Sequence, residues 1–204
     1  MSTQKRPYRM RRRAALEEQT RRRITESTVA LHEELGPART SISAIAKRAG
    51  VRRSTVYRHF PNEDALFDAC SSYWLAANPP PDHRTWAAIE DPTERTKAAI
   101  RELYAFYRQT QAMYSSLFRD EPIVPAVQRR LDDFRRYLDS VADTLMTGRG
   151  LRGRTARQTR AAISHALAFT TWHSLTNQQG LNDEDALALL CTLIEQAAHS
   201  TSAR

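Results

Sequence analysis

The sequence is poor in cysteine and has no long apolar run. Its 204 residues include only 2 cysteines, Cys70 and Cys191, and neither belongs to a Cys-x-x-Cys or Cys/His cluster. This spacing gives no sign of a disulfide framework and fits a reducing cytoplasm. No apolar stretch reaches the length of a membrane span, and none follows the basic N-terminus as a secretory signal requires. We therefore expect a cytoplasmic protein without a membrane anchor.

Alternation of apolar and polar residues, the mark of a β-strand, is also missing over any useful length. Apolar residues instead recur at spacings of three and four, which is typical of amphipathic helices. The sequence therefore predicts an all-α fold. Its length suits one medium domain or a small domain fused to a larger one.

Positive charge is concentrated at one end of the chain. The first 60 residues contain 15 Lys and Arg against 5 Asp and Glu, whereas the remainder contains 16 against 18. The first 60 residues therefore carry a net charge of +10 and the remainder −2, which together give +8. This distribution favours a polyanionic partner for the N-terminal third alone. A solvated, solubilising basic tail is the alternative interpretation.

The stretch 40–66 predicts two short helices separated by a tight turn. Thr40 and Ser41 can cap the first helix, because their side-chain oxygens can accept from unpaired N–H groups. Gly50 suits the left-handed conformation that a sharp turn requires. The apolar positions of the two helices follow helical spacing: Ile42, Ile45, Ala46, Ala49, Val56 and Phe60. The second helix is short, basic and rich in hydrogen-bond donors, which suits a DNA major groove.

Proline, glycine and charge divide the chain into three parts, with Asn78–Pro81 as the clearest linker. We expect a basic N-terminal arm over 1–19, a helix-turn-helix domain over 20–78 with its motif at about 42–60, and a helical domain over 79–204. Periodicity and capping residues predict helices at about 20–35, 42–49, 53–60, 63–77, 91–109, 111–118, 127–145, 154–178 and 183–199.

The segment 24–66 resembles the N-terminal DNA-binding domain of TetR-family transcriptional regulators. The most specific part of the match is the run Gly50-Val51-x-x-x-Thr55-Val56-Tyr57-x-His59-Phe60, and the other matching residues are Gly36, Thr40, Ser41, Ile42, Ile45, Ala46, Ala49 and Leu66. Beyond it, only the length, the helical character and the helix order are similar. His32 replaces a usual large apolar residue, and Glu63 stands where a phosphate-contacting lysine is common, so that contact is not carried over.

The resemblance implies a homodimer that binds a palindromic operator near promoters, usually as a repressor. It also implies a C-terminal helical domain that binds a small-molecule effector and dimerises through the last two helices. The partners would then be double-stranded operator DNA, the effector and a second copy of the chain. Nothing in the sequence indicates a cofactor, a metal site or a catalytic arrangement, so an enzyme is not expected.

The residues predicted to contact DNA lie in the motif and at the start of its first helix: Thr40, Ser41, Arg52, Arg53, Ser54, Thr55, Tyr57, Arg58 and His59. Arg52 and Arg53 can each form bidentate bonds to guanine or grip a phosphate. Which of the residues 52–55 reads a base stays open, and an ordinary solvated surface residue is the alternative for each.

The residues predicted to line an effector site are aromatic and lie in the second domain: Trp86, Tyr104, Tyr107, Tyr114, Phe118, Phe169 and Trp172. Sites between bundle helices are lined in this way, although an aromatic residue at helical spacing can equally be plain core. His165 and His173 could face the same side of a helix, but a metal site would need further ligands. Two other functional classes remain as alternatives, a non-specific or architectural DNA-binding protein and a helical enzyme with a basic extension.

Overall fold

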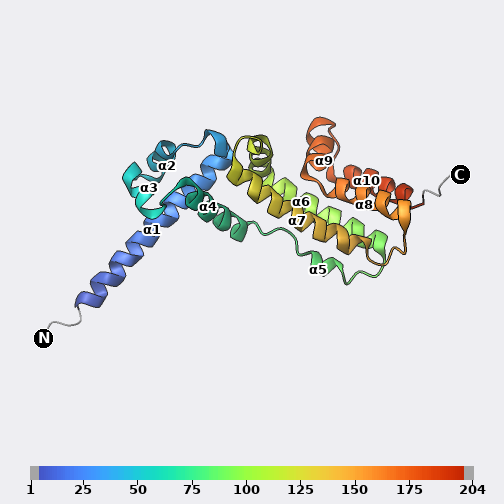
Figure 1. Ribbon diagram of the computed structural model, residues 1–204, viewed down its shortest axis with the longest axis horizontal. Helices are drawn as coiled ribbons and strands as arrows, with labels where there is room; N and C mark the ends of the chain where they lie inside the picture. Colours follow the sequence, from blue (N-terminus) through green and yellow to red (C-terminus); the bar gives the residue numbers. More distant parts are fainter. Residues whose placement is uncertain (1–4, 200–204) are drawn as a thin grey trace. The chain divides into compact units, whose positions relative to one another are not determined.

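The structure, a computed structural model, describes the backbone of residues 5–199 and the side chains of residues 10–199. Residues 1–4 of the predicted arm lie outside the described residues. Within the described range the chain forms helices and connections without a strand, which confirms the all-α prediction. The elements are α1 (Lys5–Glu34), η1 (Pro37–Arg39), α2 (Ile42–Ala49), α3 (Arg53–His59), α4 (Glu63–Ala77), α5 (His83–Trp86), α6 (Pro92–Asp120), α7 (Pro125–Met146), α8 (Gly153–Leu167), α9 (Phe169–His173), η2 (Ser174–Gln178) and α10 (Asp183–His199) (Figure 1).

The chain divides into two compact units. The first unit contains the N-terminal segment up to Pro79 and also Ser115–Gln128, while the second contains Pro80–Tyr114 and the chain from Arg129 onward. The long helices α6 and α7 therefore contribute residues to both units, a grouping that the sequence did not predict. None of the described helices combines the length and the apolar character needed to cross a membrane.

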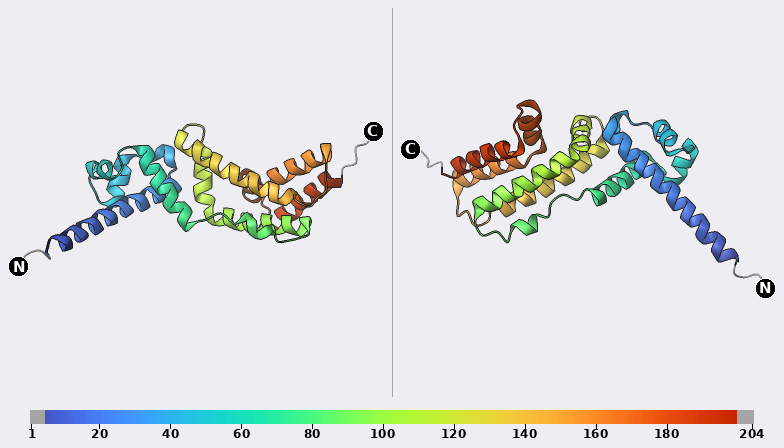
Figure 2. Two further views of the ribbon diagram at one scale, coloured as in Figure 1. Left: turned by 60° about the horizontal axis from the view of Figure 1, so that its bottom comes forward. Right: turned by 180° about the vertical axis from the view of Figure 1, so that it is seen from behind.

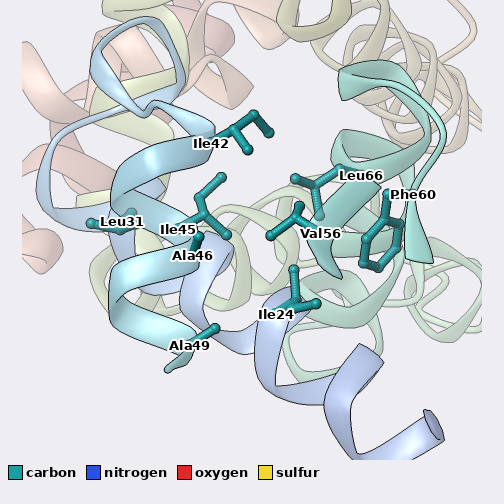
Figure 3. Packing of buried hydrophobic residues seen from close by; sticks show 9 residues of the cluster. All are labelled: Ile24, Leu31, Ile42, Ile45, Ala46, Ala49, Val56, Phe60 and Leu66. Carbon is teal, nitrogen blue, oxygen red and sulfur yellow. The ribbon is translucent and has the colours of Figure 1, made fainter. Parts of the chain in front are cut away.

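The first unit is built around a small core that is aliphatic apart from Phe60. Helices α1, α2, α3 and α4 supply its buried residues, which are Ile24, Leu31, Ile42, Ile45, Ala46, Ala49, Val56, Phe60 and Leu66 (Figure 3). The predicted starts and ends of α2 and α3 are confirmed to within one residue. The apolar positions of both helices point into this core, which leaves their polar residues on the outside.

Helix α1 is longer than the sequence predicted. It begins at Lys5, not near Thr20, so much of the expected arm is helical. Alanine, leucine, glutamate and arginine dominate residues 11–18, and all are good helix formers. Two ion pairs between residues one turn apart, Arg13–Glu17 at 3.1 Å and Arg22–Glu26 at 2.8 Å, support the same helix. Its N-terminal part extends beyond α2, α3 and α4 (Figures 1 and 2).

Residues 115–128 join the first unit through the turn after α1. Asp120 accepts a hydrogen bond from the Ala38 N–H at 3.0 Å, and Arg119 donates to the Leu35 carbonyl at 2.8 Å. Gly36 makes this approach possible, because its φ of 87° is left-handed and a Cβ there would overlap the side chains of both residues. The glycine is therefore required by both its backbone conformation and its neighbours.

The second unit is a helical bundle in which α8 and α10 lie side by side (Figures 1 and 2). Helix α7 and helix α10 agree with their predicted ranges. The predicted break near Gln109 is wrong, because α6 continues to Asp120 without a proline or glycine to end it. The short helix α5 was not predicted.

The predicted helix 154–178 is interrupted in the structure. Ala168 takes an extended conformation (φ −71°, ψ 133°) that separates α8 from α9, and residues 174–178 form a π-helix. Because α8 ends here, the last carbonyls of the helix have no backbone N–H donors within it. The hydroxyls of Tyr104 and Tyr107 donate to two of them, Ala166 O at 3.0 Å and Leu167 O at 2.6 Å. Tertiary hydrogen bonds thus stabilise a break that local propensity does not predict.

Candidate nucleic-acid interface

The turn between α2 and α3 follows the predicted geometry. Ser41 caps α2, since its hydroxyl accepts from the Ala44 N–H at 3.2 Å. Thr40 does not cap the helix; its hydroxyl donates to the Gly36 carbonyl at 2.8 Å. Gly50 ends α2 with a left-handed φ of 64°, and the Val51 N–H bonds back to Ala46 O at 2.9 Å. The two helices are therefore joined by a rigid, hydrogen-bonded turn.

Helix α3 has one buried side and one exposed side. Val56 and the following Phe60 are each only 1% exposed and pack in the core of the first unit (Figure 3). The opposite side carries most of the predicted DNA-contacting residues; Arg52, Arg53, Ser54, Tyr57 and Arg58 are exposed, and Thr55 and His59 are half-buried. The structure thus gathers seven of the nine predicted residues on α3 and its N-cap.

The end of α3 is fastened to α1 by a residue that sequence reasoning missed. Arg21 donates to the carbonyl of His59 at 2.8 Å, and its guanidinium lies 4.3 Å from the ring centroid of Phe60. The only sequence signal for Arg21 was its place in an arginine run, which does not distinguish it from its neighbours. This contact fixes the direction of α3 relative to α1.

The surroundings of His59 favour its neutral form. Burial lowers its pKa, and the charges of Arg58 and Arg21 lower it further. Its Nε2 atom is buried and has no hydrogen-bond partner among the described residues. A neutral imidazole nitrogen can donate or accept according to its tautomer, but the burial of Nε2 keeps it from a phosphate as the side chain stands.

Two neighbouring charges modify the surface around the motif. Arg48 forms two hydrogen bonds of 2.6 Å to the carboxylate of Glu34, so its charge is largely paired, while Lys47 stays exposed. Glu63 lies in the first turn of α4, where an acidic side chain suits the helix dipole. Arg48 therefore adds little free positive charge beside α3, whereas Arg52, Arg53 and Arg58 on α3 and its N-cap are exposed.

His32, the departure noted in the sequence, is part of the core. It is 7% exposed, its ring centroid lies 5.8 Å from that of Phe67, and its Nδ1 lies 3.7 Å from the sulfur of Cys70. Burial lowers the pKa of His32 to about 4, against the opposing charge of Asp120. At neutral pH it is an uncharged ring, which explains how it replaces a large apolar residue.

The predicted effector-site aromatics separate into three groups. The largest is a cluster in the second unit with ring centroids 5.4 to 6.5 Å apart between neighbours, made up of Tyr104, Tyr107, Tyr114, Phe169 and Trp172. Trp86 is also buried but bonds to Glu102 at 3.0 Å. Phe118 belongs to the first unit and is half-buried. Their role as effector contacts stays a prediction.

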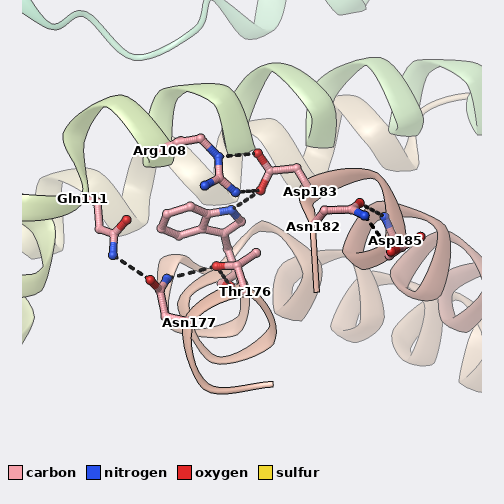
Figure 4. Close-up of polar contacts among 8 residues, drawn as sticks. Arg108, Gln111, Thr176, Asn177, Asn182, Asp183 and Asp185 are labelled. Atoms are coloured by element: carbon pink, nitrogen blue, oxygen red, sulfur yellow. Dashed lines mark hydrogen bonds and ion pairs between the residues drawn. The ribbon is translucent and has the colours of Figure 1, made fainter. Parts of the chain in front are cut away.

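A network of polar contacts adjoins this cluster at Trp172 (Figure 4). The Asp183 carboxylate accepts two bonds from Arg108, at 2.7 and 2.5 Å, and one from the Trp172 indole N–H at 2.9 Å. Hydrogen bonds from Arg108, the largest influence, lower the pKa of Asp183. Gln111 bonds in turn to Asn177 on the π-helix at 2.9 Å. Arg108 and Asp183 lie 75 residues apart, and Gln111 and Asn177 lie 66 residues apart, so no local pattern could have paired them.

Comparisons with known proteins agree with this geometry. A family model described as bacterial regulatory proteins, tetR family, matches residues 24–70. No curated protein sequence matches the chain. Among solved structures, a TetR-like transcriptional regulator from Rhodococcus sp. RHA1 is 16% identical, covers 92% of this chain and 98% of its own, and has a TM-score of 0.63.

Two further solved structures are similar. A transcriptional regulator from Rhodococcus sp. Rha1 is 16% identical, with 87% of this chain and 95% of that chain covered and a TM-score of 0.59. The multidrug binding protein EbrR, complexed with imidazole, is 18% identical, with 85% and 88% covered and a TM-score of 0.55. At such identities the likeness shows the fold.

These matches define a class, helical proteins with an N-terminal helix-turn-helix domain. Residues 24–70 match the N-terminal domain of the tetR family, and the chain has the fold of TetR-like transcriptional regulators. The resemblance predicted from the motif is confirmed.

Proposed function

We propose that this protein is a homodimeric transcriptional repressor that binds a palindromic operator and leaves it when a small-molecule effector binds the second unit. The observation that carries the proposal is the exposed cationic side of α3, with Arg52, Arg53 and Arg58 displayed by a helix whose other side is locked into the core. Arginine presented in this way suits guanine edges and phosphates in a major groove. A repressor of promoters would act in the cytoplasm.

Dimerisation would use α8 and α10. Leu189 and Leu193 lie one turn apart on α10 and are 51% and 46% exposed, and Ala161 is exposed on α8. A two-fold four-helix contact would cover these residues and place two α3 helices about 34 Å apart, or a multiple of that distance. A second copy of the same apolar face is the natural cover for it.

The five-ring cluster supports a small-molecule effector. Aromatic linings with a few oriented polar groups are typical of sites between bundle helices, and here Arg108 and Asp183 are such groups. One structural neighbour is described as a multidrug binding protein complexed with imidazole. An effector that moved these rings would act on the break at Ala168, because two tyrosine hydroxyls hold that break.

The test is a gel-shift titration of Arg53→Ala with the DNA fragment that the full-length protein selects from random sequence. We expect operator binding to weaken by roughly 1–3 kcal/mol and sequence preference to relax. The matched control is Arg84→Ala in the second unit, whose exposed pair with Asp82 is remote from α3 in sequence and contributes little to stability. Unchanged affinity and preference in Arg53→Ala would contradict the proposal, and equal affinity for random DNA would favour a non-specific binder.

A further inference from the structure

The N-terminal part of α1 forms a charged surface that the motif does not account for. We call residues 10–20 the α1 extension. Its positive residues are Arg11, Arg12 and Arg13, and its negative residues are Glu17 and Glu18. Every residue from Met10 to Gln19 is exposed, so no described part of the protein covers this surface.

Two of these arginines are free to meet an anion. Arg13 pairs with Glu17 at 3.1 Å, whereas Arg11 and Arg12 form no ion pair with any described residue. A row of exposed, unpaired guanidinium groups attracts a polyanion, because its counterions are released on binding. The partner for this surface is therefore negatively charged.

The α1 extension has a fixed direction relative to α3. Arg21, which directly follows the extension, bonds to the last carbonyl of α3 and stacks on Phe60. Further along, Glu26 of α1 accepts from Arg22 at 2.8 Å and from the Tyr73 hydroxyl of α4 at 2.8 Å. The extension is thus a helical continuation of α1 that begins close to the end of α3 and projects beyond α2, α3 and α4 (Figures 1 and 2).

We infer that the α1 extension is a second DNA-contacting element, which binds phosphates outside the half-site that α3 reads. The inference rests on the proposed function, since it needs α3 on the duplex. At about 1.5 Å per residue, Arg12 lies about 14 Å beyond Arg21 along the helix. An extension following the duplex would therefore reach phosphates about four base pairs further along, at 3.4 Å per pair.

The apolar residues of the extension argue for DNA over a membrane surface. Met10 and Leu16 are 68% and 54% exposed, but they are six residues apart and so lie about 120° apart around a helix. A helix that binds in a membrane interface needs a continuous apolar face, which these two residues do not form. A helix that binds DNA phosphates needs positive side chains close to the DNA backbone, but no apolar face.

The test compares full-length Arg11→Gln/Arg12→Gln with the parent protein on two duplexes that carry the selected palindrome. One duplex ends about two base pairs outside the palindrome and the other extends about ten base pairs on each side. On the long duplex we expect the variant to bind roughly tenfold more weakly, with a salt slope smaller by about 0.9 for each phosphate that it no longer neutralises. On the short duplex the two proteins should bind alike.

Two further variants separate charge from folding. Arg11→Lys/Arg12→Lys keeps the charge and should bind the long duplex like the parent protein. Glu17→Gln/Glu18→Gln removes the negative charges and should bind it several-fold more tightly, since it also frees Arg13. A gain in affinity is not a result that misfolding gives, and glutamine is about as good a helix former as arginine or glutamate.

Equal binding of the long duplex by Arg11→Gln/Arg12→Gln and the parent protein would overturn the inference. If Arg53→Ala still weakens binding in that case, the proposed function is supported without the inference; if Arg53→Ala also binds like the parent protein, the proposed function fails too.

Vesicles of phosphatidylglycerol serve as the competing polyanion. Loss of vesicle binding without loss of DNA binding would assign the extension to a membrane surface and would also overturn the inference.

Discussion

The two units of the protein treat their polar groups in opposite ways. In the first unit the charged side chains of α3 lie outside a small hydrophobic core. In the second unit a cluster of aromatic rings is buried, and the polar atoms of these rings bond inside the protein, as Tyr104, Tyr107 and Trp172 show. The exposed donors of α3 suit the DNA partner that we propose, whereas the polar atoms of the ring cluster bond to the protein's own backbone and side chains.

The two units should therefore respond differently to substitutions. A change on the exposed side of α3 alters contacts with a partner but leaves the core intact. A change in the ring cluster alters hydrogen bonds to the carbonyls beside Ala168, where α8 ends. We therefore expect substitutions in the first unit to separate binding from stability, and substitutions in the second unit to affect helix structure directly.

The largest effect is expected from Phe60→Ala. This ring is 1% exposed and stacks on Arg21, so its removal should lower the free energy of unfolding by about 3–5 kcal/mol. Urea denaturation measures this loss. The matched change is Tyr57→Ala, one turn earlier and 43% exposed, which should weaken DNA binding but change stability by less than about 0.5 kcal/mol. Equal destabilisation by both would remove the distinction between the two sides of α3.

A smaller effect concerns pH and the buried His32. Its pKa falls from an ordinary 6.5 to about 4 in the folded protein. Between these values the unfolded chain binds a proton that the folded chain does not, so stability falls as the pH falls. From about pH 7 to about pH 5 this histidine should cost about 2 kcal/mol of unfolding free energy.

His32→Phe supplies the control for this pH dependence, because it keeps a large ring beside Phe67 and cannot be protonated. Denaturant titrations at both pH values should show a smaller loss in the variant than in the parent protein. Identical losses would mean that His32 does not titrate in this range. Burial raises the pKa values of Tyr104, Tyr107 and Tyr114, so the second unit's ring cluster stays uncharged throughout.

The smallest effect is expected from Tyr107→Phe in the second unit. The change removes one hydroxyl and leaves the Leu167 carbonyl without that donor, which should cost about 1–2 kcal/mol in the free energy of unfolding. Tyr73→Phe removes a comparable bond at the surface, to Glu26, and should cost less than about 0.5 kcal/mol. Urea denaturation distinguishes them, and equal values would show that the helix break does not depend on Tyr107.

Much of the first unit could be predicted because its signals are local. Ser41 caps α2 three residues before its partner Ala44, and Gly50 takes the left-handed conformation that its position requires. The spacing of Ile42, Ile45 and Val56 placed them in the core correctly. Local signals of this kind need no knowledge of the rest of the fold.

The second unit was less predictable because its determinants are distant in sequence. The break at Ala168 depends on hydroxyls about 60 residues earlier, and Asp183 depends on Arg108, 75 residues earlier. The start of α1 was predicted too late for a different reason. The dense arginine run suggested a basic arm, whereas the helix-forming residues in the same stretch favour a helix. The roles of the α3 residues and of the ring cluster stay predictions.

The central claim is that α3 reads DNA as one half of a symmetric pair. The most direct measurement is selection of bound fragments from random DNA by the full-length protein, followed by sequencing. We expect the selected fragments to contain a palindrome whose half-sites are about 10 base pairs apart, centre to centre, or a multiple of that spacing. Selection with Arg53→Ala should no longer enrich this palindrome. Enrichment of no common sequence, or of the same sequence by the variant, would contradict it.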